Sequence, residues 1–230
     1  MKTLGIVGGI GPESTIEYYR LIVEHYRKQQ PDGSYPLIII NSINLKKYID
    51  LGEAGKFDEF VEPLIAEIQK LKQAGAEVAL LAANTPHIVF DDIRRRSSLP
   101  LISIVEATCD AAKKLELNRI GLFGTRFTMQ AKFFAETFAR AGMTLVVPNS
   151  EEQTYIHEKY MGELLKGVIL PETRKRLLAI VEVMRERDGI QGLILGGTEL
   201  PLILRGADSA IPFLDTTVIH VEAAVAQMLS

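Results

Sequence analysis

Residues 5–15 read Gly-Ile-Val-Gly-Gly-Ile-Gly-Pro-Glu-Ser-Thr. A short apolar run ends here in a glycine-rich turn, which predicts a buried strand over Leu4–Val7. Apolar side chains at helical spacing follow the turn: Ile16, Tyr19, Val23 and Tyr26. A strand, a tight turn and a helix in this order form the opening of a βαβ unit, so the stretch favours an α/β fold.

The same alternation continues along the chain. Short apolar runs predict further strands at Pro36–Ile40, Val78–Leu81, Leu101–Ile104, Ile120–Phe123, Thr144–Val147, Gly192–Leu195 and Ile211–Leu214. Amphipathic segments between them predict helices, around Leu64–Leu71 before Gly75, around Phe134–Ala141 before Gly142, and from Pro171 to about Asp188. Near-continuous apolar strands are typical of parallel sheets covered on both faces, so we predict an α/β protein with right-handed crossovers.

A faint internal repeat divides the chain into two halves. The strand and turn at residues 5–9 resemble residues 121–125, and residues 79–85 resemble residues 193–198. The two matches have nearly the same offset, which indicates two related halves, although chance similarity of short apolar strings is the alternative. Ligands of open parallel sheets bind beyond the carboxyl ends of the strands, so we expect four such turns to meet at one cleft.

Composition narrows the class of protein. The chain has 230 residues and a formal net charge of -3, which implies no polyanionic partner, and the run Arg94–Arg96 is interpreted as a solvated helix face. The single cysteine, Cys109, cannot form an internal disulfide or a thiolate metal cluster and suits a reducing compartment. With no signal-peptide pattern and no membrane-length apolar run, we expect a cytoplasmic protein without nucleic-acid or membrane partners.

The four turns carry the candidate chemistry. The first, residues 8–15, nearly matches a dinucleotide fingerprint, but Pro12 removes a donor and the next strand ends in Asn41 and Ser42 without an acidic residue for a ribose, so we do not expect NAD. The second turn, residues 83–87, suits a carboxylate, or simply caps a helix with Thr85 at the N-cap and Pro86 after it.

The third turn, residues 124–129, and the fourth, residues 196–200, also have two interpretations. Hydroxyl and amide groups there could hold an oxyanion, whereas a helix cap and a tight turn are the simpler explanations. His87 is the histidine next to a candidate turn, and neither a metal-binding HExxH nor a G-x-S-x-G motif occurs.

At these turns the chain resembles the aspartate/glutamate racemase superfamily. The matching stretches are GIVGGIGPEST, AANTPH, GLFGTRFTM, GGTEL and IPFLDTTVIHVEAAV. The resemblance implies two Rossmann-like parallel-sheet domains related by a pseudo-twofold axis, with the active-site cleft between them. It also implies a homodimer, a small carboxylate or amino-acid substrate, no pyridoxal phosphate or other cofactor, and no metal. In the family, two thiols on opposite faces of the substrate exchange its α-proton.

Carried over by position, the resemblance places Ala83 and Gly197 where the family has its two thiols. Neither residue can exchange a proton, and Cys109, expected within a helix, does not replace them. Groups that could serve as acid or base instead are Glu199, His87 and Thr198. The residues that the resemblance assigns to substrate binding are Gly9, Ile10, Asn84, Thr85, Thr125, Thr198, Lys166 and, by a looser match, Lys47.

Three functions remain open from the sequence. The first is a racemase-like isomerase of small acidic amino acids, of the aspartate or glutamate type. The second is another enzyme on the same scaffold, such as a lyase, decarboxylase or hydrolase of a small carboxylic acid, and the third is a non-catalytic binding protein. Cysteines introduced at residues 83 and 197 are expected to raise racemase activity. The repeat predicts one domain of residues 1–103 plus 212–230 and a second of residues 104–211.

Overall fold

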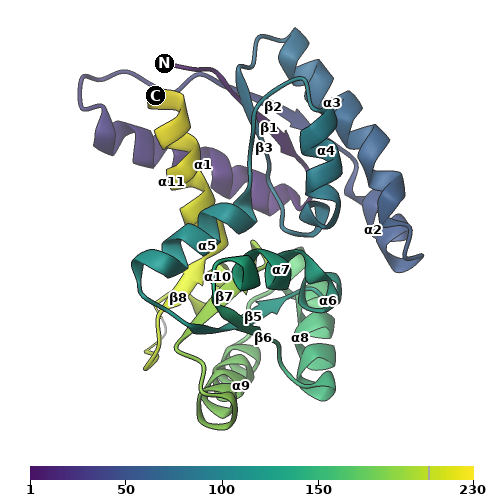
Figure 1. Ribbon diagram of the computed structural model, residues 1–230, viewed down its shortest axis with the longest axis vertical. Coiled ribbons are helices and arrows are strands. Elements are labelled where there is room, and N and C mark those ends of the chain that lie inside the picture. The colour runs from purple at the N-terminus through teal and green to yellow at the C-terminus, as the bar shows by residue number, and fades with distance from the viewer. Residues whose placement is uncertain (207) are drawn as a thin grey trace. The chain divides into compact units, whose positions relative to one another are not determined.

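The computed structural model describes residues 1–206 and 208–230, which divide into two compact units (Figure 1). Unit 1 comprises Met1–Ile104 and Thr217–Ser230, and unit 2 comprises Val105–Thr216. Each unit contains one four-stranded parallel sheet with helices packed against it. The predicted α/β fold class is therefore confirmed in both halves of the chain.

Unit 1 is built on the strand order β2-β1-β3-β4. Its strands are β1 (Leu4–Gly8), β2 (Ile38–Ser42), β3 (Val78–Leu81) and β4 (Leu101–Ile102). Its helices are α1 (Pro12–Gln29), α2 (Leu45–Glu53), α3 (Val61–Gln73), α4 (Phe90–Arg96) and most of α11 (Thr216–Leu229), with short 3₁₀ turns η1 (Phe57–Phe60) and η2 (Thr85–Val89). All four strands that the sequence predicts here are present.

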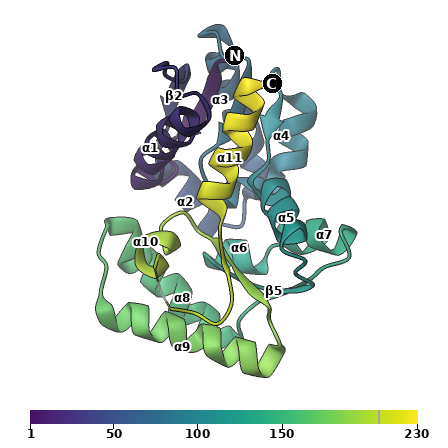
Figure 2. The same cartoon turned by 90° about the vertical axis from the view of Figure 1, so that its left-hand side faces the viewer.

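Successive side chains of the unit 1 strands enter two different cores. Val7, Ala79 and Leu81 pack with α3 and α4 on one face of the sheet, whereas Ile6 and Leu80 pack with α1 and α11 on the other (Figure 2). This alternation follows from the two-residue period of a strand. Because both faces are covered, the central strands β1 and β3 are buried along their whole length and contain no polar side chain, which is why they were recognisable in the sequence.

Unit 2 has the strand order β6-β5-β7-β8. Its strands are β5 (Arg119–Gly124), β6 (Thr144–Val146), β7 (Gly192–Gly196) and β8 (Phe213–Asp215). Its helices are α5 (Ile104–Lys114), α6 (Arg126–Gln130), α7 (Lys132–Arg140), α8 (Ser150–Gly162), α9 (Pro171–Asp188) and α10 (Leu200–Leu204), with the 3₁₀ turn η3 (Leu164–Lys166). Side chains of β5 and β7 pack against α8, α9 and α10 in one apolar core.

The two units share one topology. In each sheet the first strand lies between the second and the third, and the fourth strand pairs with the third. β1 corresponds to β5 and β3 to β7, as the repeat in the sequence predicts. Both units therefore place the turns after their first and third strands at the same edge of the sheet.

Several helix boundaries follow from single residues. Pro171 opens α9, and Gly189, with φ of 68°, allows the left-handed conformation that ends it. Gly75, with φ of 102°, follows α3 in the same way. Asn149 and Glu152 form a capping box at the start of α8, with hydrogen bonds of 2.9 and 2.8 Å.

Two sequence-based expectations are wrong in detail. The apolar stripe predicted on α1 faces the core only at its C-terminal end, because Ile16 and Tyr19 are 64% and 51% exposed whereas Tyr26 is buried. Tyr18 and Ile22, outside the predicted stripe, are fully buried. The expected domain boundary between residues 211 and 212 comes too early. β8 pairs in parallel with β7, so unit 2 continues to Thr216 before the chain returns to unit 1.

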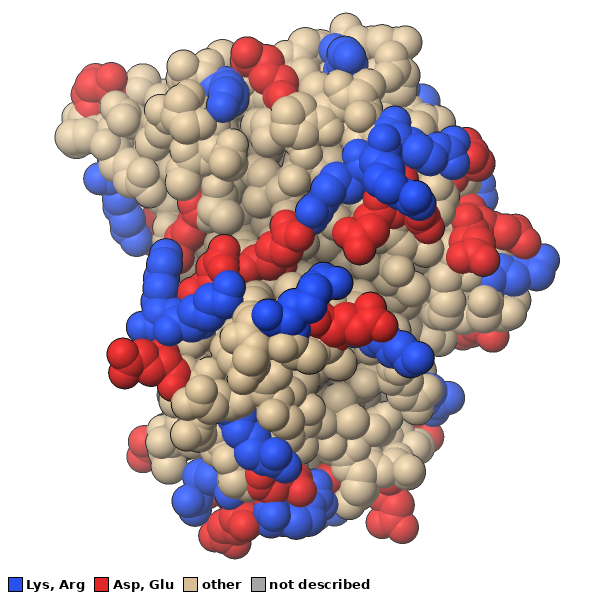
Figure 3. All heavy atoms as spheres, in the orientation of Figure 1, with Lys and Arg blue, Asp and Glu red and all other residues tan. Residues whose placement is uncertain are grey.

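Acidic and basic side chains are interspersed over the face shown in Figure 3. In the run Arg94–Arg96, Arg95 pairs with Asp92, Arg96 lies 2.6 Å from Glu62, and Arg94 stacks over the ring of Phe90. These contacts support the interpretation of the run as a solvated helix face. Among the helices of residues 1–206 and 208–230, none is long and apolar enough to cross a membrane.

Candidate functional site

In unit 1 the turns after β1 and β3 lie side by side. The strands are hydrogen-bonded neighbours, with Val7 opposite Leu81, so their carboxyl ends emerge together. Ser14, in the first turn of α1, joins the two turns because its hydroxyl donates a hydrogen bond of 2.9 Å to the carbonyl oxygen of Ala82. The structure thus brings Gly9 and Asn84 to one edge of the sheet.

Glycine is required at the end of β1. A Cβ on Gly8 would lie 2.5 Å from Cγ2 of Thr15, and one on Gly9 would lie 2.4 Å from the carbonyl oxygen of Ile43. Gly9 also has φ of 78°, and its N–H donates a hydrogen bond of 2.8 Å to Oγ1 of Thr15. The side chain of Ile10 is buried in the core. A ligand at residues 8–10 would therefore contact main chain rather than side chains.

The second turn is almost entirely buried. Ala83, Asn84 and His87 are all less than a tenth exposed, and Thr85 is partly exposed. Thr85 is not the N-cap that the sequence predicts, because it is already the first residue of η2 and Asn84 holds the capping position. The bare methyl group of Ala83 packs in the apolar core with Val7 and Ile10.

His87 is held as a neutral ring. Its Nδ1 donates a hydrogen bond of 3.0 Å to the carbonyl oxygen of Ala83, and its Nε2 accepts one of 3.3 Å from the N–H of Ile104. The ring stacks on Phe90, with centroids 4.6 Å apart. Burial lowers the pKa of His87 to about 3, with a further contribution from His220. These contacts favour a structural role over that of an acid or base.

In unit 2 the turns after β5 and β7 are likewise neighbours. Gly124 is paired with Gly196, and a Cβ on Gly124 would lie 2.9 Å from the Gly196 carbonyl oxygen. Thr125 caps α6, since its hydroxyl accepts a hydrogen bond of 3.2 Å from the N–H of Thr128. This hydrogen bond confirms the helix-cap explanation of the turn. A carboxylate-binding role for the same turn stays a prediction.

The fourth turn contains a buried carboxylate. Glu199 is only 2% exposed, and its Oε2 accepts a hydrogen bond of 2.9 Å from the hydroxyl of Thr198. The same oxygen accepts a short hydrogen bond from the hydroxyl of Tyr160, on α8. Burial, and then the charge of Glu199, raise the pKa of Tyr160 well above 10. Tyr160 could not be recognised from the sequence, because it lies on a helix far from any turn motif.

The two candidate lysines are less well defined. Lys47 lies in the first turn of α2, and Lys166 ends η3 just before Gly167. Both are exposed, so neither is held in place by packing. Their assignment to a substrate's side-chain carboxylate continues to rest on the resemblance.

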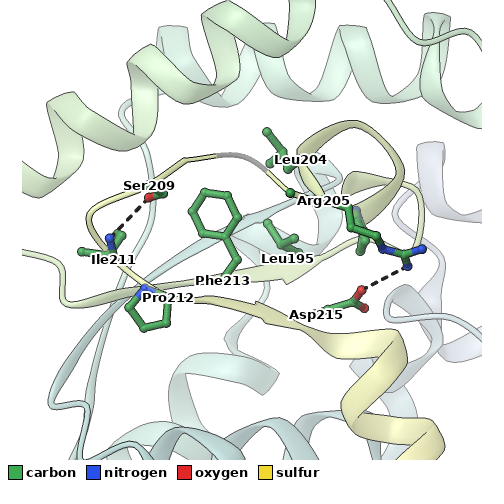
Figure 4. A pocket seen from close by; sticks show the side chains of 10 residues that line it. Leu195, Leu204, Arg205, Ser209, Ile211, Pro212, Phe213 and Asp215 are labelled. Carbon is green, nitrogen blue, oxygen red and sulfur yellow. Dashed lines mark hydrogen bonds and ion pairs between the residues drawn. The ribbon is translucent and has the colours of Figure 1, made fainter. Parts of the chain in front are cut away.

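A separate cavity of about 330 Å³ lies in unit 2 (Figure 4). Its lining comes from β7, α10, β8 and the segment between them, and includes Leu195, Leu204, Arg205, Ser209, Ile211, Pro212, Phe213 and Asp215. Arg205 and Asp215 lie 3.6 Å apart at one side, and Phe213 points into the space (Figure 4). None of the predicted site residues lines this cavity.

Comparison with known proteins gives a consistent result. A sequence model of the family described as Asp/Glu/Hydantoin racemase matches residues 7–224. The crystal structure of an aspartate racemase homologue from Pyrococcus horikoshii OT3 is 36% identical, with both chains fully covered and a TM-score of 0.85. A candidate Asp/Glu racemase from Yersinia pestis is 34% identical, again with full coverage of both chains and a TM-score of 0.91.

A curated relative with an assigned activity is more distant. The broad specificity amino-acid racemase RacX of Bacillus subtilis (strain 168) is 23% identical over 232 residues, which cover 99% of this chain and 98% of that protein. The similarity thus extends over both units.

Proposed function

Because this chain belongs to the Asp/Glu/Hydantoin racemase family, we propose that it binds a small acidic amino acid of the aspartate or glutamate type and weakens the bond to its α-hydrogen. The observation that carries this proposal is the duplicated arrangement of turns. Each unit places the turns after its first and third strands next to each other, where parallel sheets bind ligands.

In this proposal the turns hold the amino acid through hydrogen bonds. The main-chain N–H group of Ile10, next to Gly9, and side chains of Asn84, Thr85 and Thr125 hold the α-carboxylate and stabilise the charge that develops when the α-proton leaves. The hydroxyl of Thr198 joins them by turning from Glu199 to the carboxylate when the amino acid binds. Lys47 and Lys166 contribute positive charge towards a side-chain carboxylate. Neither pyridoxal phosphate nor a metal takes part.

The substitutions at the thiol positions limit the rate. Ala83 has no exchangeable proton, and Gly197 has no side chain at all. Inversion needs a proton donor and a proton acceptor, and each such group typically contributes ~10²–10⁴-fold. We therefore expect binding to be retained and racemisation to be slow, with Glu199 as the candidate base of unit 2.

Incubation with L-aspartate and with L-glutamate in D₂O tests the proposal. Loss of the α-proton signal by NMR, together with D-enantiomer detected by chiral chromatography, supports an isomerase. Binding in a calorimetric titration without any α-exchange supports a binding protein, and consumption of a carboxylic acid into other products supports a lyase or decarboxylase. The proposal would be refuted if the protein showed no binding and no α-exchange with any acidic amino acid.

Substitutions on the two units test whether both contribute to binding. Asn84→Ala in unit 1 and Thr198→Ala in unit 2 should each weaken L-aspartate binding by roughly tenfold, because each removes a hydrogen bond to a charged ligand. Thr144→Ala is the matched control. Thr144 starts β6 at the opposite edge of the unit 2 sheet and is exposed. An equal loss of affinity in the control would argue against the assignment.

We also propose that the protein is a cytoplasmic homodimer. The apolar side chains of Ile16 and Tyr19, on α1, and of Leu37, just before β2, are exposed. Such surfaces commonly mark protein contacts. Light scattering coupled to gel filtration measures the assembly directly, and a monomer at micromolar concentration would contradict a stable dimer.

A further inference from the structure

The space for a side chain at residue 197 is occupied by Tyr160. A Cβ built on Gly197 would lie 2.4 Å from Cε2 of Tyr160 and 3.0 Å from both its Cζ and its hydroxyl oxygen. These three atoms are the nearest neighbours of that Cβ, and all belong to one side chain. Gly197 is not among the glycines with positive φ, so its backbone accepts any L-residue. The nearest obstacle to a side chain here is therefore the Tyr160 side chain.

Gly196 shows the contrast with its neighbour. A Cβ on Gly196 would lie 2.9 Å from the main-chain carbonyl oxygen of Phe123 in the adjacent strand. That glycine is required by the close packing of β5 and β7, which no side-chain change can relieve. Gly197 and Tyr160 instead form a pair, in which a smaller residue at 160 would make room for a larger one at 197.

The Tyr160 hydroxyl lies where a thiol at residue 197 would project, and Glu199 lies behind it. The hydroxyl donates its hydrogen bond to Glu199 Oε2, which Thr198 also contacts. A buried carboxylate needs such donors to remain ionised. The raised pKa of Tyr160 means that the phenol keeps its proton unless an adjacent base takes it. Glu199 is in position to be that base.

We propose that Tyr160 and Glu199 together replace the second thiol as the proton-transferring group of unit 2. This inference rests on the proposed function, because it requires an amino acid bound at the turns. The bond between the α-carbon and its hydrogen breaks, and its electron pair stays on the substrate, delocalised into the substrate carboxylate. The proton forms a new O–H bond at Tyr160 Oη, and the proton that Tyr160 held passes to Glu199 Oε2. The reverse steps return a proton to carbon.

The pair predicts an unusual stereochemical result. Ala83 offers no proton, so the same phenol both removes and returns the α-hydrogen. Protons on the tyrosine and glutamate exchange with solvent between the two events. In D₂O the α-hydrogen should therefore be replaced with retention of configuration, and exchange should be at least tenfold faster than formation of the D-enantiomer.

Conservative variants test the chemical roles. Tyr160→Phe keeps the ring and removes the hydroxyl, and Glu199→Gln keeps the shape and removes the base. Each should slow α-exchange of L-aspartate or L-glutamate by about 100-fold while the calorimetric affinity for the amino acid changes little. Tyr155→Phe, on the same helix, is the control and should keep the wild-type exchange rate. If the wild-type protein exchanges the α-proton and both variants keep that exchange rate, this inference is overturned. The proposed function would still stand.

A second test needs no activity. Gly197→Cys alone should lower the melting temperature by about 5 °C, because the new side chain meets the Tyr160 ring. Adding Tyr160→Leu should recover most of that loss and give a folded protein with a thiol at residue 197. Independent, additive effects of the two substitutions would overturn the pairing. Binding by wild-type protein without α-exchange would overturn the proton-transfer role, and absence of both binding and exchange would refute the proposed function as well.

Discussion

Acid should destabilise unit 1 through two buried histidines. His220 is fully buried, and its ring is fixed by the Tyr18 hydroxyl at 2.8 Å from Nδ1 and by the Ile102 carbonyl oxygen at 3.0 Å from Nε2. Burial lowers its pKa to about 4, and that of His87 to about 3. Both rings are therefore neutral in the folded protein at a pH where a histidine in the unfolded chain is already charged.

The sign and size of the effect follow from these values. Below pH 6.5 the unfolded chain binds protons that the folded chain does not. The free energy of unfolding therefore has its full value above that pH and decreases as the pH falls towards 4. Between pH 7 and pH 5 each histidine contributes a loss of about 2 kcal/mol, or about 4 kcal/mol for the pair. The loss levels off below the folded pKa values. A change of this size is a large part of a typical unfolding free energy.

Urea denaturation followed by circular dichroism at pH 7 and pH 5 measures this loss. Hydrogen exchange, corrected for its intrinsic pH dependence, assigns it to β1 and β3 rather than to β5 and β7. The variants His87→Gln and His220→Gln should each be less stable at pH 7 but should show about half the wild-type loss between the two pH values. An unchanged pH dependence in both variants, or no loss in the wild type, would refute the assignment of neutral buried rings.

Three further predictions concern stability, each measured by thermal or urea unfolding. Gly8→Ala should lower the free energy of unfolding by about 2 kcal/mol, because its Cβ would lie 2.5 Å from Thr15. Gly162→Ala should leave that free energy nearly unchanged, because its Cβ would meet nothing within 4 Å. Equal losses in the two variants would contradict the packing at Gly8. Thr15→Val should cost about 1 to 3 kcal/mol because it leaves the buried N–H of Gly9 without its acceptor, and a neutral result would count against that hydrogen bond. Asn149→Ala should cost about 1 kcal/mol through the capping box of α8, whereas Asn118→Ala serves as an exposed control outside any helix.

Much of the fold was predictable because the strands are short runs of mostly apolar residues. Each of the eight predicted strands is present, and the repeat correctly indicated two sheets of one topology. Gly75 and Pro171 mark helix boundaries through backbone conformation, which is a local property. Local signals of this kind are strong in a sequence.

The errors arose where distant residues decide the outcome. Tyr18 rather than Tyr19 is buried on α1, where its hydroxyl bonds to His220 in the last helix. The boundary of unit 2 depends on the pairing of the three-residue strand β8 with β7. No pattern within α1 or β8 contains that information.

The candidate site shows the same limit. Turn composition singled out Asn84, Thr125 and Thr198, whose role in binding stays a prediction, but it gave no indication of Tyr160. The position of its ring against Gly197 is a tertiary contact between α8 and the turn after β7. For this reason the simple expectation that a cysteine can be restored at residue 197 needs correction, since Tyr160 must first be made smaller.

A titration of isotope-labelled protein with L-aspartate and L-glutamate, followed through backbone amide resonances, tests the central claim most directly. Binding of the amino acid at the strand-end turns should shift the amides of Gly9, Asn84, Thr125 and Thr198, and should leave the start of β6 and the middle of α9 unchanged. Shifts confined to the cavity beside Arg205 and Phe213, or to one unit alone, would contradict it.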